Sequence, residues 1–88
     1  MSVIWKFPLP HPGDELTHGI PGHGEVVCVG LDPAGEPSVW LNVNQGAPAE
    51  IRTFSVVGTS HPFPPTWRPI GSYTDGPFVW HALEVLDR

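Results

Sequence analysis

Hydrophobic and polar residues alternate with a period of two along much of this chain. In residues 4–9, tryptophan, phenylalanine and leucine alternate with isoleucine, lysine and proline. The same alternation recurs in residues 38–44 and 51–57. A period of two is typical of β-strands, because successive side chains along a strand point to opposite faces. The pattern therefore predicts a chain built from strands.

Proline and glycine clusters divide the chain into short segments of this kind. Strands are expected at residues 4–9, 15–20, 25–31, 38–44, 51–57, 68–74 and 78–86. Pro8 and Pro10 favour an edge position for the first strand, since proline cannot donate to a ladder. Residues 78–86 fit a strand buried on both faces, although Ala82–Leu86 would also tolerate a terminal helix.

The segment 25–31 is apolar apart from Glu25 and Gly30, which favours a strand covered on both faces. It forms a plausible hairpin with residues 38–44 across the turn residues 32–35. Six or seven short strands at this spacing predict a small antiparallel β-sandwich or a partly open barrel. With 88 residues, the chain has room for a single β domain spanning 1–88.

The net charge of −5, with only four basic residues, argues against duplex nucleic acid as a partner. Cys28 is the only cysteine, and its apolar neighbours predict a small core residue. The N-terminal residues lack a signal-peptide pattern, and no stretch is apolar for long enough to cross a membrane. These features predict a soluble cytoplasmic protein.

No complete catalytic signature occurs in the sequence. Ser60 and His61 could combine with Asp75 or Glu84, but residues 58–62 do not form the nucleophile elbow of hydrolases. The histidines at 11, 18 and 23 match no standard metal-ligand spacing. We therefore expect no catalytic residues, no metal site and no cofactor. His61 is better explained as a structural or ligand-orienting residue, with its ring between Gly58 and the Pro62 turn.

The four tryptophans exceed what so small a core can hold, so at least one is expected at the surface. Trp40 or Trp67 either caps an open end of the fold or anchors a partner. The pair Trp67 and Arg68 combines a flat apolar face with a cation beside a proline-rich loop. Exposed sheet edges favour a homodimer, unless Lys6 and the edge prolines block them.

Several short motifs resemble those of a family of small uncharacterised bacteriophage proteins. They are I-W-K-F-P-L at residues 4–9, R-T-F at 52–54, V-G-T-S-H-P at 57–62 and V-W-H at 79–81. The resemblance implies a phage origin and a compact β fold. Together with the cytoplasmic location expected above, it predicts residence in the host cytoplasm. It nominates Arg52, His61, Trp80 and His81 as matching positions. Ser60 departs from the glycine of the family pattern, which argues against a role that needs an unusual backbone angle there.

Three functions are compatible with these features. The first is a non-enzymatic binding protein that docks on a host bacterial protein. The second is an oligomer that sequesters a small anion or nucleotide between Arg52, Arg68, His61 and Trp67. The third is a minor component of the virion. The candidate binding residues are therefore Arg52, His61, Trp67, Arg68 and Trp40.

Overall fold

A computed structural model describes residues 1–86 of the chain, which form seven strands and no helix. The strands are Ser2–Pro8 (β1), Glu15–Pro21 (β2), Glu25–Leu31 (β3), Pro37–Asn44 (β4), Ala49–Gly58 (β5), Arg68–Asp75 (β6) and Phe78–Val85 (β7). The all-β prediction is confirmed, and each expected strand is present to within a few residues.

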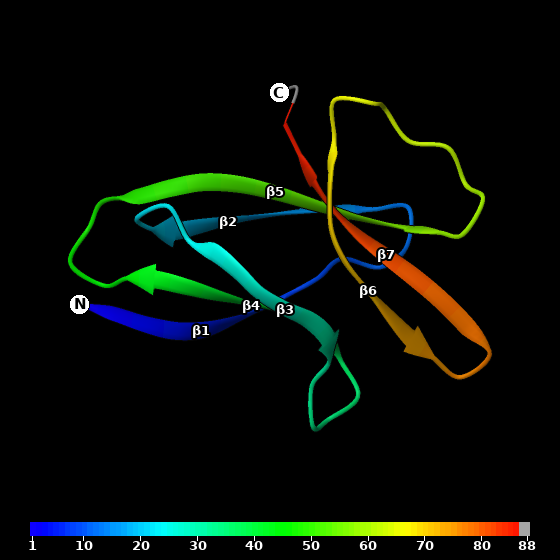
Figure 1. Ribbon diagram of the computed structural model, residues 1–88, viewed down its shortest axis with the longest axis horizontal. Helices are drawn as coiled ribbons and strands as arrows, with labels where there is room; N and C mark the ends of the chain where they lie inside the picture. The colour runs from blue at the N-terminus through cyan, green and yellow to red at the C-terminus, as the bar shows by residue number, and fades with distance from the viewer. Residues whose placement is uncertain (87–88) are drawn as a thin grey trace.

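The strands form two separate antiparallel sheets, and the fold is therefore a sandwich rather than a closed barrel (Figure 1). One sheet has the order β1-β4-β3, and the other has the order β2-β5-β7-β6. Strand β1 lies at an edge, as its prolines predicted. The predicted hairpin between β3 and β4 is confirmed, with a bulge between Val26 and Cys28.

The core lies between the two sheets and follows the period-two pattern. From β4 it takes Val39, Leu41 and Val43, and from β5 it takes Phe54 and Val56, all of them buried. The side chains between these positions face away from the core: Asn42 is exposed, whereas Ser55 is buried and donates to the carbonyl of Asp14. The side chains on one face of each strand thus build the core, and those on the other face are free to form surfaces.

Strand β3 differs from the prediction that both of its faces are covered. Cys28, Val27 and Glu25 are exposed, because nothing packs on the outer face of the three-stranded sheet here. The prediction that Cys28 is a core residue was therefore wrong. An apolar run shows that a strand tolerates burial, but the position of its sheet decides whether the second face is covered.

The last segment, residues 78–85, is a strand and not a helix, because it is the central strand of a sheet. It pairs with β5 on one side and with β6 on the other. Two ladders of hydrogen bonds outweigh the modest helix propensity of its alanine and leucines. Its second half, from Ala82 to Val85, is buried on both faces, as predicted. For its first half that prediction was wrong, because Phe78 and Val79 extend beyond the core and are exposed.

The position of β7 determines how the chain must run between β5 and β6. Both neighbours are antiparallel to β7, so they run parallel to each other. Strand β5 ends beside Trp80, and β6 begins beside Glu84 at the other end of β7. Residues 59–67, which we call the crossover loop, must therefore cross over β7 (yellow in Figure 1).

One glycine sets how closely the two sheets approach. A Cβ on Gly71 of β6 would lie 1.9 Å from Cγ2 of Val29 on β3. Alanine at position 71 must force β3 and β6 apart, and such overpacking costs about 1–3 kcal/mol. We expect Gly71→Ala to lower the free energy of unfolding by about 2 kcal/mol in urea denaturation.

The matched control is Gly30→Ala on β3, where an added Cβ meets nothing within 4 Å. It should leave stability nearly unchanged. Replacing Val29 by alanine in the Gly71→Ala background should recover part of the loss. Equal stability of the two glycine variants would contradict this account of the sheet contact.

Candidate functional site

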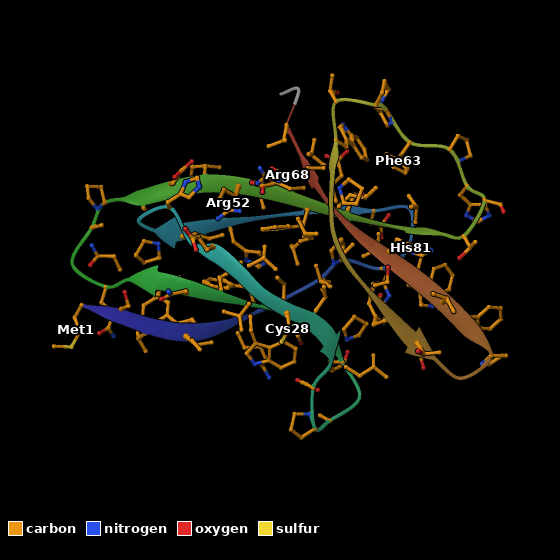
Figure 2. All side chains as sticks on the ribbon, in the orientation of Figure 1. Met1, Cys28, Arg52, Phe63, Arg68 and His81 are labelled. Atoms are coloured by element: carbon orange, nitrogen blue, oxygen red, sulfur yellow. The ribbon has the colours of Figure 1, made fainter. Side chains whose placement is uncertain are left out.

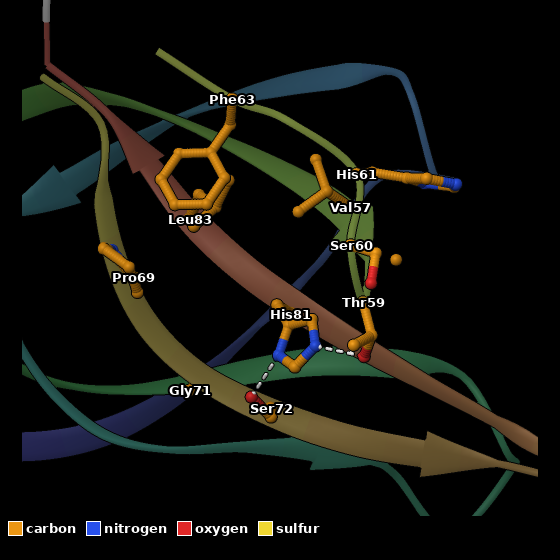
Figure 3. A pocket seen from close by; sticks show the side chains of 11 residues that line it. Val57, Thr59, Ser60, His61, Phe63, Pro69, Gly71, Ser72, His81 and Leu83 are labelled. Carbon is orange, nitrogen blue, oxygen red and sulfur yellow. Dashed lines mark hydrogen bonds between the residues drawn. The ribbon is translucent and has the colours of Figure 1, made fainter. Parts of the chain in front are cut away.

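The crossover loop encloses a pocket against the outer face of the four-stranded sheet (Figure 3). Its volume is about 400 Å³. The sheet contributes Val57, His81 and Leu83 to its floor, and the loop contributes Thr59 and Phe63 among its walls. Leu83 is fully buried although its neighbours Ala82 and Glu84 point into the sandwich, because the loop covers it. We call this cavity the crossover pocket.

His81 provides the polar end of the crossover pocket, and hydroxyl groups hold both of its ring nitrogens. Nε2 lies 2.7 Å from Oγ1 of Thr59, and Nδ1 lies 2.7 Å from Oγ of Ser72 (Figure 3). In a neutral imidazole one nitrogen donates and the other accepts, so one hydroxyl donates to the ring and the other accepts from it. The ring is thereby fixed in orientation between the loop and β6.

His61 belongs to the same loop and also lines the crossover pocket, but its ring is directed away from His81 and Phe63 (Figure 3). Its main-chain nitrogen donates to the carbonyl of Gly58 at 3.1 Å, which closes the turn at the end of β5. A Cβ on Gly58 would lie 3.1 Å from Nδ1 of His61 and 3.3 Å from the indole of Trp80. The expected contact between the His61 ring and Gly58 is confirmed.

A second depression, of about 430 Å³, adjoins the crossover pocket and shares Gly58, Thr59 and His61 with it. Its other walls are the first residues of β7 and Pro77 before them. Phe78 is 58% exposed and stacks on Trp80 with ring centroids 5.8 Å apart. Phe63, Phe78, Val79 and Trp80, here called the apolar rim, therefore border two adjoining hollows.

Arg52, the first of the predicted binding residues, is buried in the structure. Its Nε and Nη2 donate to the two carboxylate oxygens of Glu84 at 2.7 and 2.8 Å. Its Nη1 donates to the carbonyls of His23 and Gly24. These bonds occupy most of its donors, so Arg52 ties the end of β7 to the turn before β3.

Arg68 joins the same cluster from the exposed side. Its Nη2 donates to Oε1 of Glu84 at 2.8 Å, while about half of its side chain remains exposed. Figure 2 shows Arg52 and Arg68 close together near the end of β7. The structure thus brings two of the predicted residues to one carboxylate, at the end of β7 opposite to His61.

The environment of Glu84 lowers the pKa of its carboxyl group. Burial raises its pKa, but the hydrogen bonds and charges of Arg52 and Arg68 outweigh burial, so the pKa lies below its ordinary value of 4.5. The hydrogen bond from Arg52 is the largest contribution to this lowering. Glu84 is therefore ionised at neutral pH, and the buried cluster carries one net positive charge.

The two remaining predicted residues, Trp67 and Trp40, belong to different parts of the fold. Trp67 is half-buried at the end of the crossover loop, where its main-chain nitrogen donates to the carbonyl of Pro64. Trp40 is half-buried in β4, and it alternates with the core residues, so it faces outward from the three-stranded sheet. The two indoles do not share a surface.

Sequence analysis did not find the roles of Glu84, Ser72 and Thr59. Glu84 lies 32 residues from Arg52, and only the pairing of β5 with β7 brings the two together. Thr59 and Ser72 meet His81 in the same way. The isolated glutamate in an apolar strand was the one available signal, because a buried carboxylate requires a cationic partner.

Residues 1–86 contain neither a cluster of metal-binding side chains nor a membrane-spanning helix. No group of three or more histidine, cysteine or acidic side chains there could hold a metal ion. No helix that is long and apolar enough to cross a membrane is present in residues 1–86.

Comparison with protein families gives one match, the domain of unknown function DUF7352, which covers residues 1–88. This chain belongs to the DUF7352 family. Neither the curated proteins nor the solved structures contain a significant match to it.

Ser60 is an unusual position in this DUF7352 domain. Its φ is +74°, the only positive value at a non-glycine residue among those described. The departure from glycine at this position was expected to argue against an unusual backbone angle, and that expectation was wrong. The turn that aims the crossover loop away from β5 keeps the left-handed conformation with a serine in it.

Glu84 should make the stability of the domain depend on pH. Because its pKa is lower in the folded state, it stabilises the fold fully above the unfolded value of about 4.5. This contribution is lost as the pH falls through the lowered folded pKa. We expect Glu84→Gln to cost about 3 kcal/mol at pH 7 by leaving Arg52 uncompensated.

In Glu84→Gln the decline of stability from pH 5 to pH 3 should also be shallower than in the parent protein. Denaturant titrations across this range measure both effects. The exposed Glu36→Gln is the charge-matched control and should resemble the parent at pH 7. A stability of Glu84→Gln equal to that control would rule out the proposed role of the cluster.

Serine in a left-handed conformation is strained by about 1–2 kcal/mol, whereas glycine is not. Replacing Ser60 by glycine would relieve this strain, but part of the gain in stability is offset by the greater conformational freedom of glycine in the unfolded chain. We expect Ser60→Gly to raise the free energy of unfolding by about 0.5–1 kcal/mol. Ser60→Ala, which retains a Cβ, should give no gain, and a gain of equal size in both variants would refute this explanation.

Proposed function

We propose that this DUF7352 domain is a phage-encoded, non-enzymatic binding protein that acts on a host protein in the host cytoplasm. The phage origin draws on the motifs at residues 4–9, 57–62 and 79–81, which resemble those of small bacteriophage proteins. The binding role draws on the surface around the crossover loop. The observation that carries it is the apolar rim beside two adjoining hollows.

Large apolar side chains are costly to leave in water when they are grouped. Phe78 and Val79 are about half-exposed, and Phe63 is exposed above the crossover pocket. Phe63 lines the crossover pocket, whereas Phe78 and Val79 line the adjoining depression, and the two hollows share Gly58 and Thr59. Aromatic residues grouped beside a hollow are typical of the centre of a protein interface, where a partner side chain can enter.

The surface is also preorganised, which favours binding because little freedom is lost on association. Pro62, Pro64 and Pro65 each fix a backbone angle in the crossover loop. His81 ties that loop to the sheet through Thr59 and to β6 through Ser72. Main-chain bonds close the loop at both ends, at His61 and at Trp67.

Sequestration of a small anion is the weaker alternative. Within one chain, Arg52 directs its donors to Glu84 and to two carbonyls, which leaves Arg68 as the accessible cation of the cluster. A single exposed arginine that already shares a carboxylate offers little affinity for an anion. This supports the protein partner over the nucleotide.

The test is affinity capture from a lysate of the host bacterium, with Phe78→Asp compared with the parent protein. A charge in the centre of an interface costs at least about 2 kcal/mol, which is roughly a 30-fold loss of affinity. We expect the parent protein to retain one partner in stoichiometric amount and Phe78→Asp to lose it. The identity of the partner is then established by mass spectrometry and by reconstitution from purified proteins.

The matched control is Ile51→Asp, since Ile51 is 72% exposed on β5, far along the strand from the apolar rim. It introduces the same charge at an exposed apolar position and should retain the partner. Recovery of no stoichiometric partner, or equal retention by Phe78→Asp and Ile51→Asp, would count against the proposed surface.

A further inference from the structure

A separate pocket of about 320 Å³ lies at one open end of the sandwich. Its walls come from the β1–β2 connection, the β3–β4 turn and the β6–β7 hairpin; the two turns project from the lower side of Figure 1. Its lining combines two acidic residues, Glu36 and Asp75, with two aromatic residues, Tyr73 and Trp80. We call it the end pocket.

The buried polar side chain of Tyr73 distinguishes the end pocket from an ordinary gap between loops. Its side chain is 94% buried, since only 6% of the residue is exposed, and its hydroxyl makes no hydrogen bond within residues 1–86. Every fully buried side-chain nitrogen or oxygen in that range has a partner. The hydroxyl must therefore be accessible, and the end pocket is the cavity that Tyr73 lines.

The charge at the end pocket is negative and is not neutralised by the described chain. Glu36 and Asp75 are exposed, and neither side chain pairs with a lysine or arginine among residues 1–86. The Nζ of Lys6 contacts Asp32 at 2.6 Å. His11 is the one basic side chain in the lining. The net charge of the protein, −5, adds to the attraction of cations.

The walls of the end pocket are held in place before any ligand binds. The carboxylate of Asp32 accepts hydrogen bonds from the main-chain nitrogens of Ala34 and Glu36, both at 2.9 Å. This fixes the β3–β4 turn that carries Glu36. The main-chain nitrogen of Leu9 donates to the carbonyl of Pro37 at 2.9 Å and ties the facing segment to the same turn.

Strand pairing fixes the wall of the end pocket that the β6–β7 hairpin forms. Tyr73 and Trp80 are direct partners across β6 and β7, and Asp75 pairs with Phe78 in the last step of the same ladder. The charge of Asp75 reaches the Tyr73 phenol, because after burial it is the second cause that raises the pKa of Tyr73. Two aromatic rings and a carboxylate thus lie together on one rigid hairpin.

We propose that the end pocket binds an alkylammonium group. The faces of Trp80 and Tyr73 attract such a cation through their π-systems. Asp75 and Glu36 supply the opposite charge, and the Tyr73 hydroxyl accepts a hydrogen bond from an N–H donor. An anion is repelled by both carboxylates, and a neutral ligand of the same shape gains no benefit from them. This inference does not depend on the partner proposed above.

Two sources present this chemistry, namely the lysine side chain of a protein and a free quaternary amine. The test is a titration of the ¹⁵N-labelled protein followed by nuclear magnetic resonance, with the indole signal of Trp80 assigned through Trp80→Phe. The probes are a lysine blocked at both main-chain ends, choline, and 3,3-dimethylbutan-1-ol as the neutral isostere of choline. We expect a saturable shift of the Trp80 signal with at least one cation and none with the alcohol.

The variants are Asp75→Asn, which retains the turn chemistry, and the exposed Asp14→Asn as the charge-matched control outside the end pocket. Asp75→Asn should weaken cation binding about fivefold, and Asp14→Asn should leave it unchanged. Tyr73→Phe should weaken the blocked lysine more than choline, because only the lysine has N–H donors. The dispersion of the spectra verifies folding, and Glu36→Gln replaces Asp75→Asn if that variant unfolds.

Binding of the blocked lysine alone identifies a protein side chain as the source, and binding of choline alone identifies a small quaternary amine. Either result supports the proposal. It is overturned if neither cation gives a saturable shift, if the alcohol gives the same shift as choline, or if the folded carboxylate variants bind as tightly as the parent.

Discussion

The insertion of β7 between β5 and β6 is the constraint on which the rest of the molecule depends. Because β7 is antiparallel to both neighbours, the chain must return along the sheet between them, and it does so over the outer face. That path covers Leu83, creates the cavity beneath Phe63 and places Thr59 against His81. Prolines suit such a path, since they stiffen a connection that has no ladder to hold it.

A buried ion pair stabilises the other end of the same strand. Glu84 accepts from Arg52 and Arg68, and Arg52 also reaches the carbonyls that precede β3. The two sheets are therefore joined there by charge-assisted hydrogen bonds rather than by apolar packing alone. Such a cluster fixes which strands meet, because a mispaired β7 would leave a carboxylate buried without its partner.

Alternation and turn residues were enough to predict the strands, the all-β sandwich and the edge position of β1. They could not predict which strands pair, since pairing between β5 and β7 joins residues from 22 (Gly58 and Trp80) to 32 (Thr53 and Val85) positions apart. For that reason Arg52 was predicted as an exposed ligand group, whereas it is buried against Glu84. The prediction that Cys28 is a core residue was wrong for a different reason: its segment is apolar, but one face of its sheet is uncovered. A local sequence pattern shows which environments a segment tolerates. The assembly of the sheets determines which residues pack against it.

The exposed thiol of Cys28 gives the two outer faces different practical uses. It lies on the three-stranded sheet, whereas the crossover loop lies on the four-stranded sheet on the opposite side of the sandwich. As the single cysteine of the chain, it accepts a maleimide dye or a surface linker at one defined point. A probe attached there leaves the crossover loop pointing into solution, so immobilisation and fluorescence require no engineered residue.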